Sequence, residues 1–265
     1  MKKILSLAAV FAAAISGFAT AASAADFPVY PAKAALPAPA IFSWTGCYIG
    51  GVGGGNWGNS EQIARIPGNV NDGRTITGKF SLDGGIAGGT VGCQIQLGDA
   101  VIGAENDFSW TNKSGTVNDL VPFTTGTTSS TREKWIDTFR GRFGWAWDRV
   151  MFYGTAGVAI AGTDVVVTNP ALFGTVTSSM QRTGWVVGGG VEWAFWSWGW
   201  ADLTLKAEYL HAGFESKQYF VPPIVIGATT IVTRDTKLTD DMVRVGMNIK
   251  FNWESPSTRP IGARY

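Results

Sequence analysis

The residues from Met242 to Phe251 alternate between apolar and polar side chains along their whole length. The apolar face carries Val243, Val245, Met247, Ile249 and Phe251, and the polar face carries Arg244, Gly246, Asn248 and Lys250. A period of two residues is that of a β-strand. The apolar face is broad and ends in an aromatic ring, whereas the other face bears full charges. This pattern favours a barrel with lipid outside and polar groups inside.

The first 24 residues have the layout of a secretory signal peptide. Lys2 and Lys3 precede an apolar, alanine-rich run over residues 4–18, and Ala22-Ser23-Ala24 forms a small-residue cleavage site. Because the apolar run is short for a membrane-spanning helix, we expect export and cleavage after Ala24, with an uncleaved anchor as the alternative. Residues 25–43 are rich in proline and alanine and are expected to form an extended periplasmic spacer.

The charge balance argues against a nucleic-acid-binding protein. The chain has 21 basic and 20 acidic residues, and loss of Lys2 and Lys3 leaves 19 basic ones. Such a chain has no strongly basic field for nucleic acid. Charged residues make up only 15% of the chain, while 35 glycines are spread through the alternating segments, which fits strands that curve and close.

Eight strand-like segments follow one another between residues 44 and 253, the range expected to form the barrel. They cover 46–58, 79–97, 100–112, 134–148, 150–164, 181–195, 200–214 and 238–252. The connections at 98–99, 148–149 and 196–199 are short, and those over 59–78, 113–133, 165–180 and 215–237 are long and polar. Short turns at one end and long loops at the other are typical of an up-and-down outer-membrane barrel. The sequence therefore predicts an all-β fold, an eight-stranded antiparallel up-and-down transmembrane β-barrel, followed by a periplasmic tail over 254–265.

The tryptophans gather near the two ends of the predicted segments. Near the short turns lie Trp44, Trp145, Trp147, Trp193, Trp196, Trp198, Trp200 and Trp253, and near the long loops lie Trp57, Trp110, Trp135 and Trp185. Two aromatic belts at the membrane interfaces explain this distribution. The alternative is a soluble sandwich with these rings in its core.

Seven stretches, in this order, resemble a known family. They are Trp44–Gly50, Gly103–Phe108, Arg140–Gly144, Tyr153–Gly157, Gly184–Glu192, Lys206–Leu210 and Val243–Phe251. The chain is similar to the small eight-stranded outer-membrane proteins of alphaproteobacteria known as outer membrane immunogenic proteins or the "porin family". It departs from the family in the residues 252–265 that follow the last aromatic, and in Cys47 and Cys93, which stand where the family has aromatic residues.

The resemblance implies a location in the cell outer membrane and a set of partners. Outer-membrane lipid surrounds such barrels, and periplasmic chaperones and the barrel-assembly machinery act during biogenesis. In this chain the signal that the machinery reads is expected to include Arg244, Gly246, Ile249 and Phe251, inside the chain rather than at its end. The oligomeric state is left open.

The inward faces of the predicted strands carry four acids and four bases. This charge ladder consists of Glu105, Asp107, Arg140, Arg142, Glu192, Lys206, Glu208 and Arg244. An eight-stranded barrel is just wide enough for side chains to fill, so these charges must pair or be very costly. A lumen plugged in this way would conduct poorly. The alternative is that one or two strands are phased wrongly and a charge lies at the rim.

Few residues suggest catalysis or cofactor binding. His211 is the single histidine, and a lone histidine does not make a metal site with the carboxylates available, so no metal or cofactor is expected. Glu105 and Asp107 could form a glycosidase pair, but a charge ladder is favoured. We therefore expect a non-enzymatic barrel with a structural, envelope-integrity and surface-exposed role. A narrow channel for small solutes is the alternative, and a lipid-modifying enzyme with a Ser-His pair at the outer rim is a third possibility.

Cys47 and Cys93 are expected to form a disulfide. Cys47 opens the first segment and Cys93 closes the second, so both lie near the short-turn end of one antiparallel hairpin, on the outward face. The periplasm is oxidising and the number of cysteines is even. Two separate apolar cysteines facing lipid are the alternative.

Charge reversal is expected to cost more inside the barrel than in the loops. Arg142→Glu would leave buried acids without partners, whereas Lys113→Glu, placed in a solvated loop, should cost almost nothing.

Overall fold

The computed structural model describes residues 42–123 and 125–252. The predicted signal peptide, the spacer up to residue 41 and the tail with Trp253 lie outside the described residues. The strands are β1 (Gly46–Arg65), β2 (Thr75–Leu97), β3 (Ala100–Thr111), β4 (Ser114–Asn118), β5 (Thr128–Trp147), β6 (Val150–Asn169), β7 (Gly174–Ser197), β8 (Ala201–Tyr219), β9 (Ile224–Ile226), β10 (Thr229–Ile231) and β11 (Thr233–Phe251). In this part of the chain there is no helix long and apolar enough to cross a membrane.

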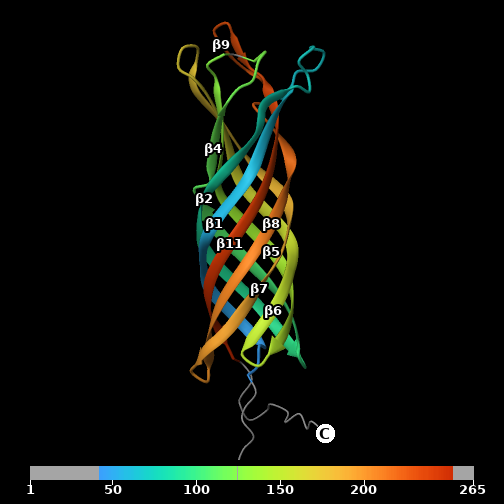
Figure 1. Cartoon of the computed structure of the whole chain (residues 1–265), viewed down its shortest axis with the longest axis vertical. Coiled ribbons are helices and arrows are strands. Elements are labelled where there is room, and N and C mark those ends of the chain that lie inside the picture. The colour runs from blue at the N-terminus through green and yellow to red at the C-terminus, as the bar shows by residue number, and fades with distance from the viewer. Residues whose placement is uncertain (1–41, 124, 253–265) are drawn as a thin grey trace, which may run out of the picture. The chain divides into compact units, whose positions relative to one another are not determined.

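Eight of these strands close into an antiparallel barrel (Figure 1). Neighbours pair in the order β1, β2, β3, β5, β6, β7, β8 and β11, and β11 pairs back with β1. The closing seam runs without a register shift from Cys47↔Phe251 to Arg65↔Thr233. Because the ring closes, none of the eight strands has a free edge, as a lipid environment requires. The predicted fold class is therefore confirmed.

The short turns lie where the sequence places them, but the strands are longer at the other end than predicted. Residues 98–99 and 148–149 join β2 to β3 and β5 to β6, and Asp148 has a positive φ of 51° in its turn. At the loop end, the residues predicted as long polar connections are largely β-structure. β1 and β2, for example, pair as far as Ile63↔Thr75, and β4 and the β9–β10 hairpin lie wholly within predicted loops. Alternation of apolar and polar residues fades there because neither face of these ribbons meets lipid.

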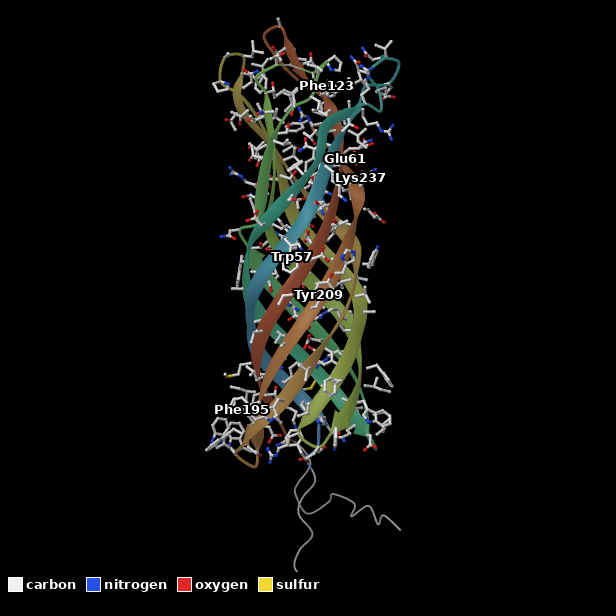
Figure 2. The ribbon with its side chains drawn as sticks, viewed as in Figure 1. Trp57, Glu61, Phe123, Phe195, Tyr209 and Lys237 are labelled. Carbon is white, nitrogen blue, oxygen red and sulfur yellow. A yellow bond between two sulfur atoms is a disulfide. The ribbon has the colours of Figure 1, made fainter. Side chains whose placement is uncertain are left out.

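Side chains alternate between lipid-facing and lumen-facing positions along every long strand. Tryptophan rings stay exposed at two levels, and Figure 2 shows one of them, Trp57, at about mid-height of the molecule and well above Phe195 at the short-turn end. Trp44 is an exception to the predicted belts, because it is fully buried at the short-turn end. Trp44 precedes Tyr48 by two periods of the alternation, so both side chains point inward. The Trp44 ring therefore closes the mouth of the barrel.

Cys47 and Cys93 are joined by a disulfide. They are Cα partners in the β1–β2 ladder, near the short-turn end of the hairpin. The bond therefore ties two strands that are already neighbours, on the outward face of the barrel.

Candidate functional site: the barrel lumen

The short-turn mouth is stopped by two aromatic rings that precede β1. Phe42 and Trp44 meet edge to face with 5.1 Å between ring centroids, and both are buried. Trp44 Nε1–H donates to the carbonyl oxygen of Asp148 at 3.0 Å, and its backbone N–H donates to Gln96 Oε1 at 2.7 Å. These bonds fix the segment across the mouth, where Lys250 Nζ also donates to the carbonyl oxygen of Ser43 at 2.7 Å. No sequence motif marks this aromatic stopper, formed by Phe42 and Trp44. Both residues are even-numbered like the inward-facing Tyr48 of β1, so continued alternation would place them inside the barrel.

All eight residues of the charge ladder point into the lumen, and each is at most 4% exposed. They come from β3, β5, β7, β8 and β11, which are spread around the ring. The short-turn side of the ladder is held by Arg142, whose Nη2 lies 2.6 Å from Glu192 Oε2 and whose Nη1 lies 3.3 Å from Glu105 Oε2. Lys206 Nζ lies 3.0 Å from the same Glu105 oxygen.

The loop side of the ladder is centred on two arginines. Arg140 pairs with Glu105, Asp107 and Glu208, at 2.5 Å from Glu105 Oε1 and 3.1 Å from Glu208 Oε2. Arg244 Nη2 lies 2.6 Å from Glu208 Oε1 and 3.2 Å from Asp107 Oδ2. Glu105, Asp107 and Glu208 each touch more than one cation, and Arg142 links Glu192 to Glu105. The eight residues therefore form one network rather than four separate pairs.

Two tyrosines that the sequence analysis did not single out complete this network. Tyr48 Oη donates to Glu105 Oε2 at 2.7 Å and accepts a hydrogen bond from Arg142 Nη1 at 2.6 Å. Tyr153 Oη donates to Glu208 Oε2 at 3.2 Å, and its ring lies 4.0 Å from the Arg142 guanidinium carbon. Both tyrosines occupy inward positions on their strands, so the alternation that predicted the charges also predicts them.

Three ladder carboxylates, those of Glu105, Asp107 and Glu208, come within 4.8 Å of one another. Such a group could hold a cation on geometry alone. Here the space around it is already filled by the positive charges of Arg140, Lys206 and Arg244, each paired with at least two of the three carboxylates. The cluster is therefore neutralised by the protein's own side chains.

An apolar layer follows the charge ladder toward the loop end. Along β8 the next inward residues after Glu208 are Leu210 and Ala212, and along β11 Met242 follows Arg244. The layer consists of Leu82, Ile86, Ile136, Ala159, Ala161, Val186, Leu210, Ala212, Phe214, Leu238 and Met242. A polar core and an apolar core are thus stacked inside one barrel.

Lys113 lies inside the barrel, so the prediction of a solvated loop lysine was wrong. It is fully buried and pairs with Glu133 at 3.0 Å and with Asp240. Asn56 Nδ2 donates to Glu133 Oε1 at 3.5 Å. The partners of Lys113 stand on β5 and β11, so nothing in its own neighbourhood of the sequence reveals its burial.

His211 lies on the outer face of β8. Its Nδ1 is 2.7 Å from Asp241 Oδ1, and its ring is 5.4 Å from that of Trp185. Among the described residues no serine hydroxyl is hydrogen-bonded to this ring. The ring is thus partnered by a carboxylate and an indole of the lipid-facing side.

The closed antiparallel ring, the lipid-facing apolar band between tryptophan belts and the filled lumen define an eight-stranded outer-membrane β-barrel. Comparisons of the sequence identify its relatives. The chain is 31% identical over 260 residues to the 31 kDa outer-membrane immunogenic protein of Brucella melitensis, covering 91% of this chain and 98% of the relative. It is 30% identical over 182 residues to the 22 kDa outer membrane protein of Rhizobium leguminosarum, covering 67% of each.

The chain therefore belongs to the family of outer-membrane immunogenic proteins, and it is a protein of the cell outer membrane. No protein-family model matches the sequence. Among solved structures, the outer membrane protein OprG from Pseudomonas aeruginosa is 12% identical, with a TM-score of 0.42, covering 77% of this chain and 96% of that one. The attachment invasion locus protein Ail of Yersinia pestis is 10% identical, with a TM-score of 0.35, covering 77% and 99%.

Proposed function

We propose that this protein is a non-conducting, non-enzymatic barrel that strengthens the outer membrane and presents its loop end outside. The observation that carries the proposal is the stacking of layers along the lumen. The aromatic stopper is followed by the charge ladder and then by the apolar layer, in which Met242 and Leu238 flank Asp240, the partner of Lys113.

Each layer opposes ion flow in a different way. The aromatic rings and the apolar side chains offer a passing ion no polar partner, and the Lys113 group beside them is paired with its own acids, so an ion would have to give up its hydration there. The charge ladder offers partners, but they are already engaged with one another. An ion that entered would have to displace a buried pair, and breaking such a pair costs about 3–5 kcal/mol.

The same engagement speaks against catalysis in the lumen. Glu105 and Asp107 are bound by Arg140, so neither carboxylate is placed to act on a substrate. A lipid-modifying activity would instead need a nucleophile at the outer face, and the candidate base there, His211, is engaged by Asp241.

Planar-bilayer recording tests the non-conducting state. The purified barrel should give no discrete openings under conditions in which a general porin, as positive control, opens readily. A second sample, with residues 221–232 replaced by Asn-Gly, removes a loop-end hairpin and should stay equally silent, because the lumen and not the loops blocks the path. Regular openings in the wild type would favour the narrow-channel alternative.

Two further assays separate the envelope role from enzymatic activity. Cells that lack the protein should become more sensitive to detergent and to large antibiotics, and the wild-type gene should restore resistance. Purified protein should release no fatty acid from phospholipid or lipopolysaccharide. Fatty acid release by the wild type that is lost in His211→Ala would show a lipid-modifying enzyme instead.

A further inference from the structure

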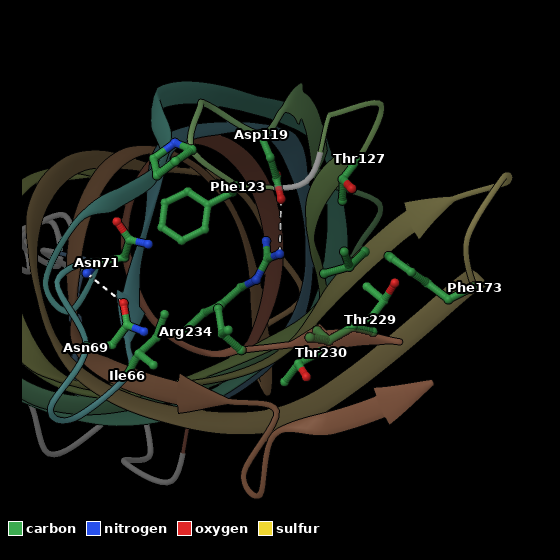
Figure 3. A pocket seen from close by; sticks show the side chains of 14 residues that line it. Ile66, Asn69, Asn71, Asp119, Phe123, Thr127, Phe173, Thr229, Thr230 and Arg234 are labelled. Atoms are coloured by element: carbon green, nitrogen blue, oxygen red, sulfur yellow. Dashed lines mark hydrogen bonds and ion pairs between the residues drawn. The ribbon is translucent and has the colours of Figure 1, made fainter. Parts of the chain in front are cut away.

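The loop end contains a cavity of about 410 Å³ that lies outside the lumen layers (Figure 3). Its walls come from the β1–β2 connection, the segment before β5, the β10 strand and the start of β11. A separate apolar cluster, formed by Val165, Val167, Tyr219, Phe220 and Ile231, supports these walls. The volume lies within the range of small-molecule sites, about 300–1,000 Å³.

Arg234 forms the floor of this cavity and carries a balanced charge. Its Nη2 lies 3.1 Å from Asp119 Oδ2, and its Nη1 donates to Gln62 Oε1 at 2.9 Å and to Ser129 Oγ. Its Nε is buried and has no partner in the described structure. Burial lowers the pKa of Arg234 from its usual value, and the Asp119 carboxylate opposes that shift. The floor of the cavity thus carries no net charge.

The walls add further donors and an aromatic ring. Asn69 Oδ1 accepts the backbone N–H of Asn71 at 2.9 Å, and Asn71 Oδ1 accepts a bond from Arg74 Nη1 at 3.3 Å. Their amide oxygens are therefore engaged, and their amide nitrogens remain to donate. Phe123 projects into the same space from the segment before β5, and Figure 3 shows its ring near the two asparagines.

We propose that this cavity binds a neutral saccharide, such as the terminal sugar of a surface glycan. A sugar ring has an apolar face that suits the Phe123 ring and oxygen atoms that suit the amide nitrogens of Asn69 and Asn71. An inorganic or carboxylate anion fits less well, because Asp119 already compensates the one cation. A fatty chain fits less well, because half of the lining residues are polar.

Isothermal titration of the detergent-folded full chain tests this site. The probes are glucose, galactose, mannose, N-acetylglucosamine and their disaccharides, with acetate and phosphate as the anion arm. At least one sugar should bind with a saturable heat, and the two anions should not. If no sugar of the panel binds, or if the anions bind and the sugars do not, the proposal is overturned.

Three variants locate the binding. Phe123→Ala should weaken binding at least tenfold, while Phe123→Tyr, which keeps the ring, should bind nearly as well as the wild type. Phe195→Ala is the matched control, because Phe195 is also partly buried but lies at the opposite end of the barrel (Figure 2). Each variant should keep the gel shift of a folded barrel on heating. Equal loss of affinity in Phe123→Ala and Phe195→Ala, or no loss in Phe123→Ala, would place the sugar elsewhere and overturn the proposal.

Discussion

Arg140 and Arg244 illustrate what a charged residue needs inside a closed barrel. Each is buried, and each is shared between two or more carboxylates of other strands. Desolvating these groups is costly, and the cost is offset only when partners are in place. A single residue in this network therefore acts on several strands at once.

Arg142→Glu should destabilise the barrel strongly. The change removes the cation that pairs with Glu192 and adds a carboxylate next to those of Glu192 and Glu105. The free energy of unfolding should therefore fall by at least about 3–5 kcal/mol, the cost of breaking a buried pair. Urea titration of the detergent-folded protein measures it. Lys237→Glu is the matched control, because Lys237 is 61% exposed and its pair with Glu61, at 3.8 Å, is worth about 0–1 kcal/mol. Equal urea midpoints for the two variants would rule out the inward ladder.

Lys113→Glu should behave like Arg142→Glu rather than like Lys237→Glu. It would bring three carboxylates together in a fully buried site with Glu133 and Asp240. The milder Lys113→Met should cost less, because it removes the cation without adding an anion. A urea midpoint of Lys113→Glu close to that of Lys237→Glu would mean that the side chain is solvated after all.

The strand β11 closes the barrel, and its two faces have different tasks. Its inward face supplies Arg244, and its outward face ends at Phe251, whose ring stacks on Trp200 with 6.2 Å between centroids. Asn252 still belongs to the closed end, because its backbone N–H donates to the carbonyl oxygen of Trp200 at 2.9 Å. The residues from 253 onward lie outside the described structure and carry two prolines that cannot donate to a ladder.

Deleting residues 253–265 should leave a barrel that inserts into the outer membrane, whereas Phe251→Asp should reduce insertion. The aspartate would place a charge on the lipid face and remove the terminal aromatic of the expected assembly signal. Membrane fractionation with a heat-modifiability gel measures both. Insertion that survives Phe251→Asp but fails after the deletion would make Tyr265 the terminal aromatic of the signal.

Thiol counting tests the element that opens the barrel, the β1–β2 hairpin. Denatured, unreduced protein should contain no free thiol, because Cys47 and Cys93 are direct cross-strand partners. The Cys47→Ser/Cys93→Ser variant should still fold, since the two strands remain paired along the rest of the ladder. Two free thiols in the wild type would contradict the disulfide.

The sequence predicts the elements well where both faces of a strand are constrained. Between the tryptophan belts, lipid selects apolar residues on one face and the narrow lumen selects paired charges on the other, so the phase of Glu105, Arg142 or Arg244 can be read from alternation alone. Above the outer belt this constraint ends. The predicted first segment therefore stops before the true end of β1 at Arg65, and the predicted second segment starts after the true beginning of β2 at Thr75. Lys113 was missed because its partners are 20 and 127 positions away, and Trp44 because its place at a segment end outweighed its inward phase.

At the scale of the whole molecule, the barrel has two parts with separate cores. The lumen layers fill the membrane-spanning part, and the cluster around Tyr219 and Ile231 supports only the loop end. Contacts between strands continue from one part into the other, but the buried apolar clusters do not merge. The membrane part should therefore fold without a complete loop end, because surface loops generally tolerate insertions and deletions.

Replacing residues 221–232 by Asn-Gly should leave the barrel intact and abolish the cavity. Arg234 and Tyr219 are Cα partners in the ladder between β11 and β8, and Thr233 Oγ1 donates to the carbonyl oxygen of Phe220 at 2.9 Å. A two-residue hairpin turn can therefore join the two strands at this point. The shortened protein should still migrate differently before and after boiling, but should lose any sugar binding because Thr229 and Thr230 line the cavity. Gly54→Val is the contrasting variant, because its side chain would collide with the carbonyl oxygen of Val243 at the closing seam, and it should lose the gel shift. A shortened protein that fails to fold would show instead that the loop end and the membrane part form one cooperative unit.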